Sequence, residues 1–415
     1  MITILYVLAA LLVAGLLLFR FNQVWIFLFD RAKRNSTSSL APDRYEHPQY
    51  LKLNAQGQPD LAARWPGWDG WYFFVLPDDS GLPVKMVRGS LMTGTYGLEG
   101  IDNYDILQFR LSTFDVAEFL CLVPTEMKVE GKRQRHSLLS HHYLPRRDNL
   151  EIRSGRLDVR VAGRDPKRDE VKQFYGQISG AWPNYRMNFR HPEAGISIQL
   201  DYSGKNILWW ADLPGVFTYF ATIGRFEGEI RYEDGVERPD AHQIEGPEAR
   251  FPIRGFGAFE HGFARKAFDF DPLFLPVRLL KLVLPVRPIR YHYELFLDEA
   301  EMQGGFMLAR AFGVAVRNLG GLFLEGSFRR IQDVRIEYDE SSREVVDHAV
   351  PERAVYYRRW KVRARAGGGV LEYTAVREFP PAPVAPHMTY YHFRYEGSYQ
   401  GRRIAGRGYG EYAHL

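Results

Sequence analysis

The chain contains Arg225-Phe226-Glu227-Gly228 followed by Arg254-Gly255-Phe256-Gly257, and later Arg394-Tyr395-Glu396-Gly397 followed by Arg407-Gly408-Tyr409-Gly410. Two matched pairs of tetrapeptides in the same order indicate an internal duplication. The copies lie roughly 150 to 170 residues apart, far more than the period of a solenoid or propeller unit, so each copy is expected to end a whole domain. Glycine within a strand permits a bulge or a sharp bend, which predicts that these phrases lie in the strands that close two barrels.

Length and composition agree with two domains made of strands. The 415 residues exceed what one hydrophobic core usually serves. Aromatic residues make up 14% of the chain, which is the bias of β-strands rather than of a helical bundle. The formal charge of +4 is small against 54 basic and 50 acidic residues, so no nucleic-acid partner is expected.

Several segments alternate apolar with polar or charged side chains at a period of two. Clear cases are Arg156–Ala162, Gly195–Tyr202, Tyr291–Asp298 and Trp360–Ala366. This alternation predicts half-buried antiparallel strands, and no long amphipathic helix competes with it. Many short strands of this kind predict an all-β fold, either a barrel or a sandwich, and closure of a barrel removes exposed strand edges.

The N-terminus carries an apolar run of 18 residues, Ile2–Phe19, which is long enough to cross most of a bilayer core. It predicts a single-pass N-terminal transmembrane helix. The alternative is a cleaved signal peptide, but no basic residue precedes the run and no clean small-residue cleavage site follows it. Basic residues do follow the run, so the positive-inside rule places the later domains in the cytoplasm. The predicted division is an anchor with its basic flank at 1–34, a linker at 35–60, a first barrel at 61–260 and a second barrel at 261–415.

Three motifs carry a resemblance to a known superfamily. They are the Trp71-Tyr72-Phe73 opening, the Tyr293–Asp298 strand leading into Met307–Arg310, and the C-terminal Tyr395-Glu396-Gly397 with Gly406–Glu411. They resemble the carotenoid 1,2-hydratase and AttH-type lipocalin-like superfamily, which also includes fungal Diels-Alderases. The resemblance implies two tandem lipocalin-like antiparallel β-barrels, and a hydratase, isomerase or cyclase that needs no cofactor. Gly70 departs from the superfamily's usual paired tryptophans, which leaves the subfamily open.

The motifs of the common enzyme classes do not occur. The sequence has no GxSxG elbow, no GxxxxGK[ST] loop, no HExxH helix, and no GxGxxG placed between a strand and a helix. The single cysteine, Cys121, lies among apolar neighbours and is expected to be a core residue. His136, His141 and His142 lie in a strongly basic segment, which disfavours a metal site. We therefore expect neither a metal nor a cofactor.

The predicted catalytic residues lie where the first copy of the repeated phrase runs on towards the second domain. Glu260 and His261 are followed by Asp269 and Asp271, and all four are set among aromatic residues. A carboxyl group buried against aromatic rings retains its proton more readily and can donate it to an alkene carbon. The resemblance likewise implies an aspartate as proton donor, without choosing between these acids. The alternative is a hinge between domains, held by polar caps.

The predicted ligand-binding residues are Trp209, Trp210, His292, Glu294 and Tyr391. The tryptophans offer π faces that stabilise a carbocation. His292 and Glu294 share one face of a strand and can orient a ligand there, although a surface ion pair is an equal alternative. The predicted partners are a hydrophobic small molecule, such as an isoprenoid, a polyene or a lipid, and membrane lipid, and the sequence leaves protein partners open. The rival to an enzyme is a non-enzymatic lipid carrier or chaperone.

Overall fold

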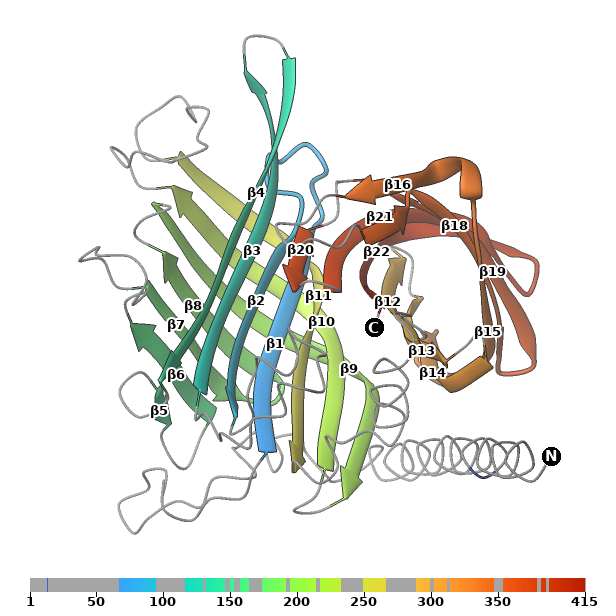
Figure 1. Ribbon diagram of the computed structural model, residues 1–415, viewed down its shortest axis with the longest axis horizontal. Helices are drawn as coiled ribbons and strands as arrows, with labels where there is room; N and C mark the ends of the chain where they lie inside the picture. The colour runs from blue at the N-terminus through green and yellow to red at the C-terminus, as the bar shows by residue number, and fades with distance from the viewer. Residues whose placement is uncertain are drawn as a thin grey trace, which may run out of the picture. The chain divides into compact units, whose positions relative to one another are not determined.

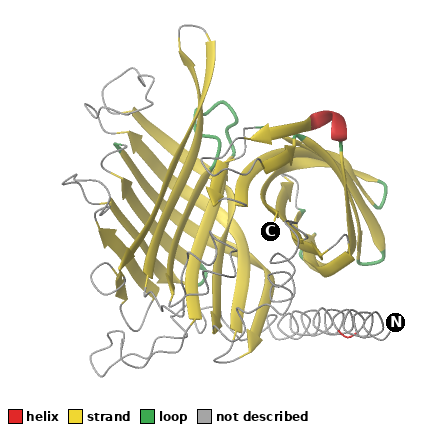
Figure 2. Cartoon of the chain, viewed as in Figure 1, coloured by secondary structure: helices red, strands yellow, loops and turns green. Residues whose placement is uncertain are grey.

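The computed structural model describes residue 13 and residues 67–94, 116–129, 132–145, 150–152, 157–163, 174–191, 195–213, 217–232, 249–265, 289–298, 302–311, 314–346, 354–378, 382–385 and 388–414. Apart from helical Val13 and a single 3-10 turn, η3 (Glu340–Ser342), the elements of these residues are β-strands (Figure 2). The strands fall into two compact units, one made of strands before Asp269 and the other of strands after Phe270. The predicted all-β fold with two domains is therefore confirmed. The predicted boundary between Glu260 and His261 falls inside strand β11, whose hydrogen-bonded ladder runs on to Arg265.

The first unit is an eleven-stranded antiparallel sheet that curls so that β2 and β3 come close to β6 (Figure 1). Strands that follow one another in sequence pair in the sheet, except β4 and β5, and β11 pairs with β1 and so joins the last strand to the first. Among the described strands, β4 and β5 are the edges of this sheet. The strands are β1 (Gly67–Pro77), β2 (Val87–Gly94), β3 (Val116–Val129), β4 (Lys132–Pro145), β5 (Leu150–Ile152), β6 (Leu157–Gly163), β7 (Phe174–Ala181), β8 (Asn184–His191), β9 (Ile196–Leu213), β10 (Phe217–Tyr232) and β11 (Ala249–Arg265).

The second unit is a closed barrel in which β12, β13, β14, β15, β18, β19, β21 and β22 follow one another around the ring. Each pairs with the next, and β22 returns to β12, which gives the up-and-down topology of a lipocalin-like barrel. A separate pair, β16 with β17, lies between β15 and β18 in the chain. The strands are β12 (Ile289–Asp298), β13 (Gln303–Ala311), β14 (Val314–Leu324), β15 (Ser327–Tyr338), β16 (Arg343–Val346), β17 (Ala354–Tyr357), β18 (Arg359–Ala366), β19 (Gly369–Arg377), β20 (Ala382–Ala385), β21 (Met388–Tyr399) and β22 (Arg402–His414).

The two ends of the second barrel differ in their connections. At one end, three two-residue turns join the strands, at Glu325-Gly326, Gly367-Gly368 and Gln400-Gly401. Both residues of each turn have positive φ, as the tight hairpin turns that match strand twist require. The longer connections, which include β16 and β17, leave from the other end. We call this second end the open end of the barrel, and it carries the site described below.

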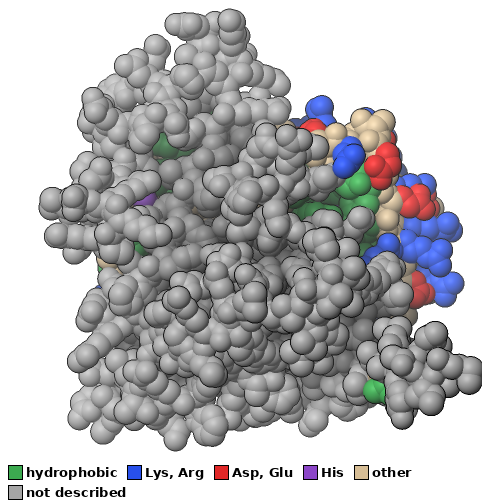
Figure 3. All heavy atoms as spheres, viewed as in Figure 1, with side chains coloured by type: hydrophobic (Ala, Val, Ile, Leu, Met, Phe, Trp, Pro, Cys, Tyr) green, Lys and Arg blue, Asp and Glu red, His purple; other side chains and the backbone are tan. Residues whose placement is uncertain are grey.

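Side chains alternate between the inside and the outside of the second barrel along β18 and β19. Along β18, Trp360, Val362 and Ala364 are buried and the basic residues between them are exposed. The outer face carries cross-strand ion pairs such as Lys361–Glu372 and Arg365–Asp333, and Figure 3 shows charged side chains gathered on this surface. Exposed pairs of this kind contribute little to stability, so the aromatic and aliphatic interior holds the barrel together.

The repeated phrases lie in the last two strands of each unit, β10 with β11 and β21 with β22, and the final strand closes on the first. Their glycines allow close approach of the neighbouring strand. A Cβ atom on Gly228 would lie 1.9 Å from the carbonyl oxygen of Gln199, and one on Gly397 would lie 2.0 Å from that of Glu372. The same position in both copies therefore brings two backbones together where no side chain fits.

We expect Gly228→Ala and Gly397→Ala each to lower the free energy of unfolding by about 1 to 3 kcal/mol, because the added methyl group forces the strands apart. The measurement is chemical denaturation followed by circular dichroism. Gly326→Asn serves as the control, since Gly326 has φ of 75° and a Cβ atom there would meet nothing within 4 Å, and asparagine tolerates this conformation. Equal stabilities of all three variants would contradict the close approach.

Cys121 lies on β3 opposite Gly89 and is buried, as the sequence predicts. Burial raises the pKa of its thiol to about 12. A thiol with so high a pKa contains almost no thiolate near neutral pH, and the thiolate is the reactive form. We therefore expect no reaction with a disulfide reagent in the folded protein at about pH 8, and full reaction once denaturant is added. Rapid labelling of the folded protein would show that the thiol is accessible.

No helix in the described part of the chain is both long and apolar enough to cross a membrane. The predicted transmembrane helix, its basic flank and the linker lie outside the described residues, apart from Val13.

Candidate functional site

A buried acid and a histidine lie on the inner face of β12 in the second barrel. Glu294 is 0% exposed and His292 is 4% exposed, although both side chains are ionisable. The two residues are two positions apart on β12, so their side chains point to the same face of the strand, and this face is the inner one. The alternative of a surface ion pair is therefore wrong. Groups of this kind are buried only where hydrogen bonds compensate for lost hydration, so their partners determine what they do.

Glu294 accepts hydrogen bonds from three side chains on three strands. His292 Nε2 lies 2.5 Å from its Oε1, Trp360 Nε1 donates to the same oxygen at 2.6 Å, and the Tyr373 hydroxyl donates to Oε2 at 2.5 Å. The indole nitrogen can only donate, so the oxygen it meets must accept. These donors stabilise Glu294 as a carboxylate that orients its neighbours, and not as a proton donor.

His292 links this carboxylate to a hydroxyl group nearer the solvent. Its Nδ1 lies 3.1 Å from the Tyr338 hydroxyl oxygen, and its Nε2 also lies 3.0 Å from the hydroxyl of Tyr391. A carboxylate holds the proton of the imidazole on Nε2, which leaves Nδ1 of the neutral ring to accept from Tyr338. Tyr338 is partly exposed where Glu294 is fully buried. Carboxylate, imidazole and phenol thus form a continuous chain towards the open end.

Aromatic rings surround this chain. His292 stacks on Phe306, with ring centroids 6.0 Å apart and an interplanar angle of 13°. Tyr338 stacks on Tyr357 of β17, at 4.6 Å and 24°. Tyr412 lies edge-on to His292 at 6.1 Å. The phenol of Tyr338 therefore opens onto a largely aromatic environment, which suits a hydrophobic ligand.

A glycine of the repeated phrase makes room for part of this cluster. Gly410 lies opposite Tyr391 on the neighbouring strand and also opposite Glu294. A Cβ atom on Gly410 would lie 2.3 Å from Tyr391 Cζ, so the tyrosine ring rests directly on the glycine. Only this close approach lets the Tyr391 hydroxyl reach His292. The second copy of the phrase thus shapes the site as well as closing the barrel.

The tyrosines of the cluster are strongly perturbed acids. Burial, followed by the charge of Glu294, raises the pKa values of Tyr373 and Tyr391 well above their usual range. Both hydroxyl groups therefore stay protonated in the folded protein and remain available as donors.

This perturbation predicts how stability depends on alkaline pH. Because the folded pKa values lie above the unfolded value of about 10, the unfolded chain releases these protons first, and stability falls as pH rises past about 10. Tyrosinate absorbance measures the effect. Tyr373→Phe and Tyr391→Phe should not change the number of tyrosines that titrate near pH 10 in the folded protein. If either variant had one fewer tyrosine titrating near pH 10, the replaced tyrosine would be an accessible phenol with an ordinary pKa.

Of the four residues predicted to be catalytic, the structure describes Glu260 and His261. Glu260 and His261 are neighbours on β11 and are both buried, at 8% and 0% exposed, but successive residues of a strand point to opposite faces. His261 stacks flat on Trp71, with centroids 5.0 Å apart and an interplanar angle of 2°. Several predicted residues fall outside the description: Asp269 and Asp271 entirely, and the side chains of Trp209, Trp210, His136, His141 and His142.

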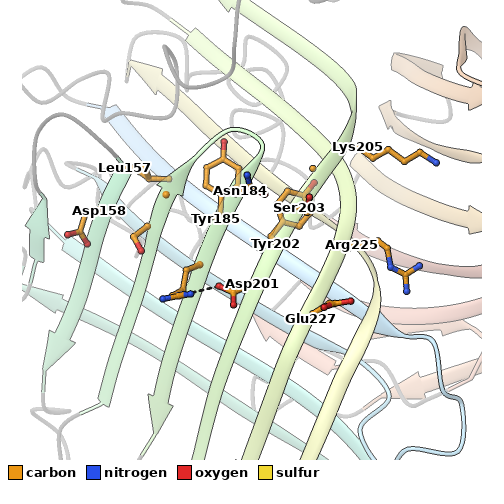
Figure 4. A pocket seen from close by; sticks show the side chains of 14 residues that line it. Leu157, Asp158, Asn184, Tyr185, Asp201, Tyr202, Ser203, Lys205, Arg225 and Glu227 are labelled. Atoms are coloured by element: carbon orange, nitrogen blue, oxygen red, sulfur yellow. Dashed lines mark hydrogen bonds and ion pairs between the residues drawn. The ribbon is translucent and has the colours of Figure 1, made fainter.

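The first unit carries an open hollow of about 890 Å³ where the turn between β7 and β8 meets β9 and β10 (Figure 4). Tyr185 and Tyr202 line part of it, and charged side chains such as Arg186 and Asp201 line other parts, together with small and polar residues. The ion pair of Arg186 with Asp201 is about two-thirds exposed on both sides, so water screens it. The charged pair of this hollow is therefore solvated, whereas the second barrel buries its acid and histidine.

Three residues of the buried cluster were not identified from the sequence: Tyr338, Trp360 and Tyr373. Alternation along Trp360–Ala366 places Trp360 on the inner face, and this signal is present in the sequence. Its meeting with Glu294, 66 positions earlier, depends on the order of strands around the ring.

The comparisons with known proteins find similarity in fold only. No protein-family model matches the chain, and no curated protein matches it by sequence. Among solved structures, an AttH candidate from Nitrosomonas europaea is 11% identical, with 84% of this chain and 92% of that chain covered and a TM-score of 0.48. CghA, solved with Sch210972, is 12% identical, with 89% and 95% covered and a TM-score of 0.49. Kievitone hydratase from Nectria haematococca is 9% identical, with 89% and 97% covered and a TM-score of 0.45.

At 9% to 12% identity no residue role is carried from these proteins to this chain. The function proposed next is therefore argued from the chain's own side chains.

Proposed function

We propose that the protein binds a hydrophobic small molecule at the open end of its second barrel and converts it by proton transfer, as a hydratase, isomerase or cyclase that needs no cofactor. The observation that carries this proposal is the chain of Glu294, His292 and Tyr338, which runs from a fully buried carboxylate to a partly exposed phenol. A base oriented by a carboxylate and bonded to a hydroxyl group is the arrangement that activates a hydroxyl for catalysis.

The chain moves a proton in either direction without changing the covalent structure of the protein. When a substrate releases a proton to the Tyr338 oxygen, the phenolic proton passes to His292 Nδ1, and the imidazolium that forms is stabilised by Glu294. In the reverse direction, the imidazolium returns its proton through Tyr338 to a different atom of the substrate. Loss of a proton at one carbon and gain at another is an isomerisation. Hydration or cyclisation starts from the imidazolium form: the substrate gains the proton, water or an internal alkene attacks, and the proton that the added water or the cyclised cation then loses returns through Tyr338 to His292.

The surroundings favour this chemistry for an apolar substrate. The rings of Phe306 and Tyr412 pack against His292, and Tyr357 packs against Tyr338. Because His292 and Glu294 are buried, the attraction between imidazolium and carboxylate is stronger than it would be in water. Aromatic faces also stabilise positive charge that develops on a substrate.

The test begins with mass spectrometry of lipophilic compounds that co-purify with the full-length protein. The recovered compounds are returned to fresh protein in D2O, and mass and retention time are followed. We expect a compound that gains deuterium or changes retention time only when protein is present. Recovery of unchanged compounds without deuterium would support the rival class, a lipid carrier, and would overturn the enzymatic proposal.

We also propose that the apolar run Ile2–Phe19 tethers the chain to a membrane, with the two units on the cytoplasmic side. The support is the length of the run and the basic residues that follow it. Tethering would hold the protein beside membrane lipid, where hydrophobic substrates dissolve. Protease added to sealed right-side-out vesicles should leave the two units intact until the vesicles are lysed, and digestion before lysis would reverse the orientation.

A further inference from the structure

A second feature of the open end is an arginine on the inner face of the barrel. Arg377 is the last residue of β19 and follows the inward-facing residues Tyr373 and Ala375 at a spacing of two. Its side chain is only 4% exposed. It pairs across β19 and β21 with Phe393, which is also buried. A guanidinium group therefore lies on the inner rim, among the aromatic side chains of the core.

Arg377 lies near the proton-transfer chain in the register of the sheet. It pairs with Phe393 on β21, two residues from Tyr391, whose hydroxyl contacts His292. Burial lowers the pKa of Arg377, and the carboxylate of Glu344 opposes this effect. Arginine remains charged even so, because its unperturbed pKa lies above about 12. The site thus keeps a permanent positive charge beside a residue of the cluster.

The only hydrogen-bonding partner of this side chain among the described residues is Glu344 of β16. The two partners are unequally buried, because Glu344 is 44% exposed while Arg377 is 4% exposed. A guanidinium has five N–H donors in a planar fork that matches a carboxylate, so a single partner leaves most of this capacity for another oxygen group. Glu344 can move into water at little cost, whereas Arg377 cannot.

We propose that Arg377 binds an anionic oxygen group of the ligand, so that the molecule bound at the open end is a hydrophobic acid, and that Glu344 occupies the position of the ligand carboxylate when no ligand is bound. This inference rests on the proposed site at the open end. The ligand carboxylate replaces Glu344 at the guanidinium, and the apolar body lies against Tyr338, Tyr356 and Tyr412. Exchange of one carboxylate for another leaves no buried charge without a partner.

The exchange predicts opposite effects for two substitutions at one ion pair. Arg377→Gln removes the charge and should weaken binding of an acid by about 10-fold or more, with little effect on a neutral ester. Glu344→Gln removes the competing carboxylate and should strengthen binding of the acid by several fold, again with little effect on the ester. A residue with only a structural role would change both probes together and in the same direction.

The experiment uses the full chain with cis-parinaric acid, a fluorescent polyene acid, and its methyl ester. Fluorescence titrations give the affinity for each probe in wild type, Arg377→Gln and Glu344→Gln. The matched control is Arg394→Gln on β21, since Arg394 is 61% exposed and pairs with Glu378 on the outside of the barrel. Thermal unfolding of every variant shows whether the barrel remains folded.

We expect wild type and Arg394→Gln to prefer the acid by about 10-fold or more, and Arg377→Gln to lose this preference. Equal affinity of wild type for the two probes, or no binding of the acid, would overturn the inference. So would an unchanged preference in folded Arg377→Gln, or weaker acid binding by Glu344→Gln. The proposed function is tested separately by deuterium exchange. If the preference for acids depends on Arg377 but no recovered compound gains deuterium, the protein is a carrier of hydrophobic acids and not an enzyme.

Discussion

Glu294→Ala is expected to lower the free energy of unfolding by about 3 to 5 kcal/mol. The substitution removes the acceptor for three donors at once, His292, Trp360 and Tyr373, in an interior where water cannot replace it. Each abandoned donor costs about 1 to 3 kcal/mol, and the costs overlap because the donors share one acceptor. Urea denaturation followed by tryptophan fluorescence measures the loss, and Trp360 itself lies in the disturbed cluster.

A matched control lies on the opposite face of the same barrel. Glu372 precedes Tyr373 on β19, faces outward and pairs with Lys361 at 2.6 Å. Because this pair is partly exposed, Glu372→Ala should cost about 1 kcal/mol or less. The loss of stability in Glu294→Gln should fall between the losses of these two variants. The amide keeps one oxygen that accepts a hydrogen bond, but its NH2 group faces another donor. Similar losses for Glu294→Ala and Glu372→Ala would show that the buried network adds little to stability.

The sequence predicts much of the fold because its strongest signals are local. Period-two alternation identifies strands and their faces, as along Trp360–Ala366, where the predicted inward residues are the buried ones. The repeated phrases predict the closing hairpins because glycine is placed where neighbouring backbones meet, at Gly228 and Gly397 alike. The same signals do not distinguish a closed ring from a curled sheet, and the described strands form one of each.

The site was only partly predictable because it depends on contacts between distant strands. His292 and Glu294 were identified, since their spacing on a strand places them on one face. Their partner Trp360 comes from a strand on the far side of the ring, and no local pattern gives that register. The prediction that Glu260 and His261 act together did not take this alternation into account. The two are adjacent on β11, and adjacent residues of a strand point to opposite faces. For predicting the site, the strand face on which each residue lies is more informative than a high local density of acidic and aromatic residues in the sequence.

His292→Gln should lower the rate of deuterium exchange or conversion by a factor of about 10² to 10⁴, the usual contribution of a positioned acid or base. Glutamine retains a polar group near Glu294 but can neither accept the phenolic proton of Tyr338 nor return it. Tyr338→Phe removes the last hydroxyl of the same chain, so its loss should be of similar size. The double variant should be scarcely worse than either single variant, because residues that act as one unit are not additive.

Tyr357→Phe is the control for this pair of variants, since Tyr357 stacks on Tyr338 but donates its hydroxyl to Glu340 on the surface. It should retain the wild-type rate. Binding of the recovered compound distinguishes a chemical role from a structural one: Tyr338→Phe should bind with nearly unchanged affinity while conversion falls. If affinity and rate fell together in Tyr338→Phe, or if the losses in the two single variants simply multiplied, the phenol would hold the ligand and proton transfer would have to occur elsewhere.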